Sequence, residues 1–174
     1  MKKFLQLVLI LGVIATGSAF AQETAVKNGI PQVKIKALDG SVVGTDKIVN
    51  DGKPIILSFW ATWCKPCVNE LNTISEVYAD WQKETGVKLV AISIDDARTM
   101  ASVAPFISGK GWDYEVYCDP NGDFKRAMNV NMVPHTFLLN GKGEVVSQHT
   151  SFAMGDEDKL FEQVKKTAAG EPIK

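Results

Sequence analysis

The stretch from residue 55 to residue 86 constrains the fold of this chain more than any other. Residues 55–60 form a near-continuous apolar run, which is typical of a strand buried on both faces of a sheet. The segment that follows carries apolar side chains at helical spacing: Val68, Leu71, Ile74, Val77 or Tyr78, and Trp81. This helix is expected to end near Gly86. Cys64 and Cys67 therefore lie where a buried strand runs into a long helix.

The two cysteines are spaced for reversible disulfide formation. Cβ atoms at positions i and i+3 of a helix lie about 5–6 Å apart, and a disulfide tolerates Cα separations of about 4.4–6.8 Å. At the helix start, unpaired N–H groups and the macrodipole favour the thiolate of Cys64, which is the attacking species. Cys67, one turn inside, is expected to be less exposed and to attack Cys64 in a mixed disulfide. This arrangement predicts a redox-active dithiol.

A structural zinc site is the other common meaning of a CxxC motif. Such a site needs two further Cys or His ligands, usually as a second close pair. The remaining candidates are Cys118, His135 and His149, which are scattered along the sequence. We therefore expect no metal and no bound cofactor, and the Cys64–Cys67 disulfide itself would be the redox group.

Residues 1–21 have the layout of a secretory signal peptide. Lys2 and Lys3 precede an apolar run over 4–15, and Ala19-Phe20-Ala21 ends the segment with a small-x-small pattern. An uncleaved membrane anchor is the alternative, although the run is shorter than the roughly 20 residues of a spanning helix. We expect cleavage after residue 21 and an extracytoplasmic, periplasmic location.

The charge of the chain argues against a nucleic-acid-binding protein, and its cysteine content argues against a disulfide-rich scaffold. Removal of residues 1–21 would take away two lysines and no acidic residue, so the formal charge of −1 would become −3. A mildly acidic chain without a basic cluster gives no support for nucleic-acid binding. Three cysteines, two of them in one motif, are too few for a disulfide scaffold.

The rest of the chain alternates predicted strands with predicted helices. Residues 22–32 resemble a loose lead-in, and residues 33–170 a single domain. Further strands are predicted at 33–38, 89–94, 115–118, 135–139 and 144–149, the last two as a hairpin, and further helices at 98–109, 123–128 and 156–168. Pro105 is expected to kink or interrupt the first of these helices. This order predicts a three-layer α/β domain with a mixed central sheet.

The motif residues resemble a known superfamily. Residues 59–67, Phe-Trp-Ala-x-Trp-Cys-x-Pro-Cys, followed by Val133-Pro134, are similar to the thioredoxin superfamily. Within it, Trp-Cys-x-Pro-Cys-x-x-Glu at 63–70 behind a signal peptide resembles the TlpA/ResA-like group of exported thiol-disulfide oxidoreductases. The likeness covers roughly residues 30–170. It implies a thioredoxin-like α/β/α fold and an enzyme that reduces protein disulfides.

The resemblance implies roles for three further residues. Pro134 would be a cis-proline facing the dithiol, and Val133 would offer its backbone to an extended substrate segment. An ordinary trans proline at a strand start is the alternative. Glu70 would accept a proton from Cys67 or hold its charge in check, although a glutamate early in a helix also simply favours the helix dipole.

Residues next to the cysteines are expected to tune or present them. Lys65 would lower the pKa of Cys64 slightly, although solvent screens an exposed lysine, and Pro66 restricts the helix start. Trp63 would form an apolar contact surface for substrate. Trp60 is expected to be a core residue, because large aromatic side chains are mostly buried.

Three positions depart from the resemblance. Thioredoxins carry a buried Asp where this chain has Ser58, so proton handling is expected to fall to Glu70. The group often has Pro where this chain has Asn72, which puts a helix kink in doubt. His135 stands where Thr is common. It either titrates near the dithiol or turns away from it, and we favour the second interpretation.

The predicted partners are exported proteins that contain disulfides, apocytochrome c among them, and a membrane-bound thiol electron donor. Two other functions fit the same fold. A metallochaperone could bind Cu(I) through the two motif thiols and His135. A thiol peroxidase would need a Pro-x-x-x-Thr-x-x-Cys run, which is absent from the sequence. Cys118 is expected to be a small buried apolar residue.

Overall fold

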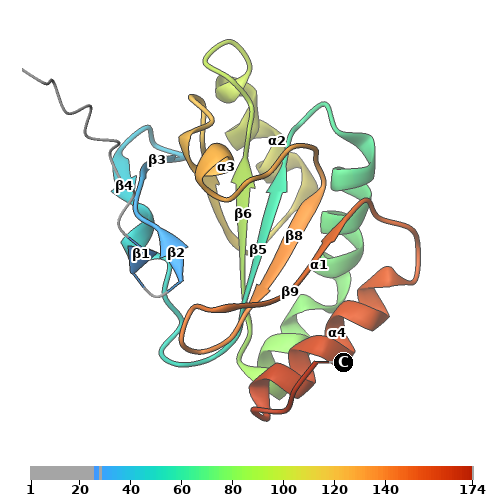
Figure 1. Ribbon diagram of the computed structural model, residues 1–174. Helices are drawn as coiled ribbons and strands as arrows, with labels where there is room; N and C mark the ends of the chain where they lie inside the picture. Colours follow the sequence, from blue (N-terminus) through green and yellow to red (C-terminus); the bar gives the residue numbers. More distant parts are fainter. Residues whose placement is uncertain (1–25, 28, 174) are drawn as a thin grey trace, which may run out of the picture.

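The computed structural model describes residues 26, 27 and 29–173 of the 174-residue chain. A seven-stranded sheet forms its centre, with the order β4-β3-β7-β6-β5-β8-β9 (Figure 1). The strands are β3 (Lys34–Ala37), β4 (Val42–Gly44), β5 (Ile55–Trp60), β6 (Lys88–Ser93), β7 (Glu115–Cys118), β8 (His135–Leu139) and β9 (Val145–Thr150). β5, β6 and β7 run parallel, whereas all other neighbours pair antiparallel. The predicted mixed sheet is confirmed.

Helices cover both faces of this sheet and give the three predicted layers. They are α1 (Lys65–Thr85), α2 (Val103–Lys110), α3 (Asp123–Ala127) and α4 (Asp156–Ala168). Buried residues of α1, α2 and α4 belong to one hydrophobic cluster, which also contains both motif cysteines. Phe124 of α3 belongs to the cluster on the opposite face. Figure 1 shows α1 and α4 side by side, and the two helices are in contact.

The central strand has the environment that its sequence predicts. Every residue of β5 is buried, and its neighbours are β6 on one side and β8 on the other. Trp60, at its end, is fully buried and packs against the rings of Phe106 and Trp112 at centroid distances of 5.8 and 5.1 Å. The prediction that Trp60 is a core residue is confirmed.

The helix predicted over 98–109 differs from the structure at its start. A 3₁₀ turn at Met100–Ser102 leads into α2, which begins at Val103. Pro105 is the third residue of α2, where a backbone N–H has no partner within the helix in any case. The helix predicted over 98–109 is therefore interrupted two residues before Pro105, where the 3₁₀ turn changes to α2.

The sequence suggested that residues 22–32 form a loose lead-in. In the structure, the described residues of this segment form two short paired strands. Ile30–Pro31 forms β2, which pairs with β1 (Val26–Lys27) in a separate two-stranded sheet. The Ile30 side chain is buried in the same cluster as Phe124. Thr45, which is 1% exposed, donates to the Pro31 carbonyl at 2.6 Å and accepts from the Val33 amide at 3.0 Å. These contacts make the segment part of the domain.

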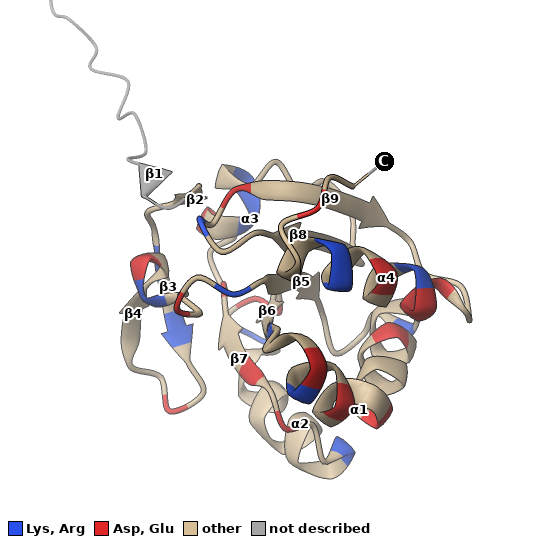
Figure 2. Cartoon of the chain, turned by 90° about the horizontal axis from the view of Figure 1, so that it is seen from below, with Lys and Arg blue, Asp and Glu red and all other residues tan. Residues whose placement is uncertain are grey.

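The signal sequence predicted at residues 1–21 lies outside the described residues. No helix within the described residues is long and apolar enough to cross a membrane. Figure 2 shows acidic and basic residues on the same helices, and α4 illustrates their order. It begins with Asp156, Glu157 and Asp158 and has Lys165 and Lys166 in its last turn, an order that complements the helix dipole.

The contacts of Thr45 predict a loss of stability on substitution. Thr45→Val keeps the shape of the side chain but leaves the Pro31 carbonyl and the Val33 amide without this partner. We expect the free energy of unfolding in urea to fall by about 1–3 kcal/mol. The same substitution at the exposed Thr150 is the control, and it is expected to change stability by less than about 0.5 kcal/mol. Equal effects of the two substitutions would contradict the structural role of Thr45.

Candidate active site

Cys64 and Cys67 form a disulfide at the start of α1. The S–S distance is 2.04 Å and the Cα atoms are 5.3 Å apart. Cys64 is the N-cap residue of α1, and its sulfur accepts the Cys67 amide at 3.4 Å. Cys64 is 6% exposed, whereas Cys67 is fully buried. The predicted difference in exposure between the two cysteines is therefore confirmed.

A buried aspartate holds the loop that joins β5 to α1. Asp95 is fully buried and accepts hydrogen bonds from the Thr62 amide at 2.8 Å, the Thr62 hydroxyl at 2.7 Å and the Ser93 hydroxyl at 2.8 Å. The Cys64 amide donates to the Ala61 carbonyl at 3.0 Å, which closes the turn before the helix. The sequence reasoning missed Asp95, because nothing in the sequence shows that a residue two positions after the end of β6 reaches this loop.

The residues around the cysteines divide into exposed and buried groups. Trp63 is 64% exposed, and Lys65 and Pro66 are also exposed. Pro66 lies in the first turn of α1, where proline withholds only an amide that has no helical partner. Trp63 therefore presents an apolar surface next to Cys64. The tuning roles of Lys65 and Pro66 stay predictions.

Glu70 is buried one turn after Cys67 and is only 1% exposed. Its Oε1 accepts from the Thr136 hydroxyl at 2.7 Å and lies 3.0 Å from Nε2 of His149. Its Oε2 is buried without a hydrogen-bond partner among the described residues. A favourable helix dipole alone does not account for this position, because burying a carboxyl group costs free energy unless the group is paired.

A row of polar side chains on three neighbouring strands lies beneath Glu70. Ser58 pairs with Thr136 in the β5–β8 ladder, and Thr136 pairs with His149 in the β8–β9 ladder. The Ser58 and Thr136 hydroxyls are 3.1 Å apart. Cross-strand partners project from the same face of a sheet. The row therefore brings Ser58, Thr136 and His149 to the face that α1 covers.

Sequence reasoning missed Thr136 and the role of His149. The sequence offered one clue to their position, namely that side chains alternate between the two faces of a sheet along each strand. Pairing Thr136 with His149 also requires the hairpin register, and that register contains a shift at Leu138–Leu139. An irregularity of this kind is not visible in the sequence.

The Val133–Pro134 peptide bond is cis, as the resemblance implies. Pro134 is buried, and the partly buried Val133 packs against the cluster that contains Cys64 and Cys67. That Pro134 faces the dithiol and that Val133 binds substrate stay predictions.

His135 turns away from the face that carries the dithiol. Its ring stacks on Phe137 at a centroid distance of 4.2 Å, and Phe137 belongs to the cluster on the opposite face of the sheet. Its Nε2 lies 3.0 Å from Oε1 of Gln148. The favoured interpretation of His135 is therefore confirmed, and this histidine does not join the two thiols in one ligand set. Among the described residues, no group of three or more His, Cys, Asp or Glu side chains could hold a metal ion.

Two other positions singled out in the sequence have structural roles. Cys118 is buried at 2% exposure, as expected, and burial raises the pKa of its thiol to about 11. Asn72 accepts a hydrogen bond from the Trp112 indole at 3.0 Å. α1 continues through Asn72 as one helix of 21 residues.

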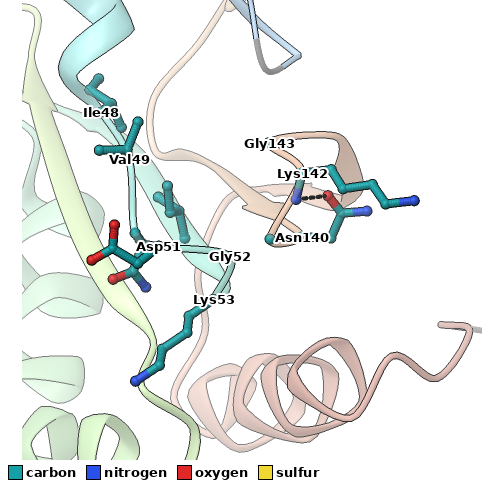
Figure 3. Close-up of a pocket in the computed structure, with 11 residues that line it drawn as sticks. Ile48, Val49, Asp51, Gly52, Lys53, Asn140, Lys142 and Gly143 are labelled. Carbon is teal, nitrogen blue, oxygen red and sulfur yellow. Dashed lines mark hydrogen bonds between the residues drawn. The ribbon is translucent and has the colours of Figure 1, made fainter.

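A surface pocket of about 330 Å³ lies at the other end of the central strands. Figure 3 shows its lining residues, which include Ile48, Lys53 and Asn140. Ile55, the first residue of β5, also lines it. The dithiol lies beyond the other end of this strand, which is Trp60. The length of β5 therefore separates the pocket from the dithiol. The pocket is not part of the dithiol site.

Comparison with known proteins agrees with this geometry. The model of the AhpC/TSA family matches residues 26–148. Thiol-disulfide oxidoreductase ResA of Geobacillus kaustophilus is 31% identical over 164 residues, covering 92% of this chain and 91% of that protein. Sporulation thiol-disulfide oxidoreductase A of Bacillus subtilis is 30% identical, with coverage of 79% and 82%. A ResA of Oceanobacillus iheyensis is 32% identical over 69% of this chain, and the match spans 62% of its own length.

Solved structures show the same fold. An uncharacterized thioredoxin-like protein from Porphyromonas gingivalis is 48% identical, with a TM-score of 0.73 and coverage of 83% of this chain and 95% of that chain. A putative thiol:disulfide interchange protein DsbE from Chlorobium tepidum is 27% identical, with a TM-score of 0.69 and coverage of 84% and 99%. The fold, the CxxC pair and these relatives agree: the chain belongs to the AhpC/TSA family of thioredoxin-like proteins and, within it, to the thiol-disulfide oxidoreductases that include ResA and sporulation thiol-disulfide oxidoreductase A (StoA).

Proposed function

We propose that this oxidoreductase reduces disulfides of exported proteins in the periplasm, through the Cys64–Cys67 dithiol and with Glu70 as the proton acceptor of Cys67. The proposal is based mainly on the different positions of the two cysteines. The slightly exposed Cys64 caps α1, while the fully buried Cys67 lies one turn before a buried carboxyl group. The two thiols therefore have different access to a substrate and to a proton acceptor.

The reaction proceeds in two exchanges. The Cys64 thiolate attacks a substrate disulfide, forms a mixed disulfide and releases one substrate sulfur as a thiolate. Cys67 then loses its proton to Glu70 and attacks Cys64, which forms the Cys64–Cys67 disulfide and releases the second substrate sulfur. The substrate gains two electrons and the dithiol loses them. A thiol donor restores the dithiol by the reverse exchange, so no other cofactor is required.

The reducing direction is supported by the charge near Cys67. A dithiol whose reduced form is stabilised acts as an oxidant. A buried carboxylate one turn from Cys67 disfavours a second negative charge on that sulfur. It therefore destabilises the thiolate form and makes the dithiol a better reductant.

The substrate surface is proposed to consist of the side chain of Trp63 and the loop that ends at Pro134. Trp63 is 64% exposed and Met132, which precedes Val133, is 62% exposed. An extended client segment would pair with the Val133 backbone as an added strand. The two exposed apolar side chains would contact the residues that flank its disulfide.

The proposed clients are exported proteins with disulfides, including apocytochrome c, and the proposed electron donor is a membrane-bound thiol protein. These proposals rest on the signal-like residues 1–21 and on the likeness to ResA proteins. If the segment 1–21 stayed uncleaved, it would hold the enzyme at the membrane surface.

Substitution of each cysteine tests the order of the exchanges. We expect Cys64→Ser to lose turnover of an insulin-disulfide reduction assay to the background level, because the entering nucleophile is gone. Cys67→Ser is expected to accumulate a mixed disulfide with the client, which mass spectrometry detects, because the resolving thiol is gone. Cys118→Ala is the control and keeps turnover, since that thiol is buried. Equal turnover of the wild type and Cys64→Ser would refute the proposed function.

Glu70→Gln tests the proton acceptor. The amide keeps the size of the side chain but cannot take the proton of Cys67, so we expect turnover near neutral pH to fall about 100-fold. The deficit is expected to shrink as pH rises, because Cys67 then ionises without help. The matched control is Glu76→Gln, on the same helix but exposed, which leaves turnover unchanged. A deficit that is the same at every pH would contradict the proton role.

A further inference from the structure

We propose that His149 is the outer member of a proton relay, in which it takes the proton of Cys67 through Glu70 and passes it to solvent. The proposal rests on the proposed proton role of Glu70 and extends it to a strand residue on the opposite side of that carboxyl group. Glu70 itself is almost fully shielded from solvent by the described residues, at 1% exposure. His149 is its only polar neighbour with substantial exposure among the contacts that the structure describes, at 31% of its side chain.

The contacts of Glu70 single out His149. Two groups reach its Oε1, and they are the Thr136 hydroxyl at 2.7 Å and His149 Nε2 at 3.0 Å. Thr136 is fully buried and cannot exchange protons with solvent directly. Histidine is also the side chain that ordinarily gains and loses a proton between pH 5 and 8. Among the described contacts of Glu70, His149 is therefore the group with the chemistry to pass a proton on to solvent.

A surface pocket beside His149 offers the relay a path to solvent. The pocket has a volume of about 180 Å³ between β9 and α4, which is ample for several water molecules. Its polar lining includes Ser147, Asp156, Lys159 and Gln163 as well as His149. The relay would thus run from the buried thiol along one face of the sheet to the recess between β9 and α4.

Charged and polar groups surround the relay on both sides. Hydrogen bonds from Lys159 and the Ala153 amide lower the pKa of Asp156, which therefore stays ionised near His149. Lys159 is held in an ion pair with Asp156 at 2.8 Å. On the other side, burial raises the pKa of the Tyr114 phenol near Glu70, so that phenol stays neutral. Glu70 and Asp156 are thus carboxyl neighbours of His149.

The proton steps balance within the site. The Cys67 S–H bond breaks and its proton joins Glu70, and Glu70 passes a proton to Nε2 of neutral His149, a nitrogen that carries no hydrogen when the ring is protonated at Nδ1. The site then holds a Cys67 thiolate, a Glu70 carboxylate and a His149 imidazolium, with no change in total charge. The thiolate attacks Cys64 and expels the substrate sulfur as a thiolate. His149 finally releases its proton to water.

A stopped-flow reaction of the reduced full-length protein with Ellman's reagent separates the two thiols. The attack of Cys64 releases the first coloured thiolate, and the attack of Cys67 releases the second. In the wild type, the rate of the second phase is expected to rise with pH over the range in which a histidine ordinarily loses its proton, between pH 5 and 8, and then to level off. In His149→Gln, this inflection is expected to disappear and the second phase to slow about tenfold near pH 7. The first phase is expected to stay unchanged.

Glutamine can still donate a hydrogen bond to Glu70, so a purely structural role of His149 would survive this substitution. Release of both equivalents by the variant shows that its dithiol site is intact. The control is His135→Gln, which changes the other of the two histidines in the chain and is expected to keep the inflection. The relay is refuted if His149→Gln keeps the wild-type second phase at every pH, or if His135→Gln changes that phase equally. If Glu70→Gln slows the second phase and His149→Gln does not, the proposed function stands and the relay alone fails.

Discussion

The hydrogen bonds to Glu70 connect the helix that carries the dithiol to the strands beneath it. A buried carboxyl group costs free energy unless it is paired, and here Thr136 and His149 both reach its Oε1. The three groups come from α1, β8 and β9. Their meeting point therefore depends on the position of the helix over the sheet and on the register of the terminal hairpin.

The dithiol itself depends on how β5 runs into α1. β5 is buried between β6 and β8, so the end of the strand has a defined position. Asp95, which follows β6, holds Thr62 through two hydrogen bonds just before Cys64 becomes the helix cap. The helix then buries Cys67 and Glu70 on its inner face. The polar contacts of the loop thus help to place Cys64 at the helix cap and Cys67 in the core.

Local patterns predicted most of the fold, because apolar periodicity determines which segments become strands and helices. The cysteine pair, the buried Trp60 and the hairpin at 135–149 follow from such patterns. What local patterns cannot supply is long-range pairing. The contact between Glu70 and His149 joins residues 79 positions apart and depends on an irregular ladder. Likewise, the place of Ile30 in the core depends on contacts with residues distant in the chain, not on its own neighbours.

Equilibration of the purified protein against glutathione or dithiothreitol redox buffers tests most directly whether Cys64 and Cys67 form a redox-active pair within an intact fold. We expect one reversible two-electron transition, in which the number of titratable thiols in the denatured protein rises from one to three while the circular dichroism spectrum stays native. The single thiol of the oxidised form is Cys118. A disulfide that resists reduction in these buffers, or whose reduction unfolds the domain, would contradict a catalytic dithiol and indicate a structural crosslink.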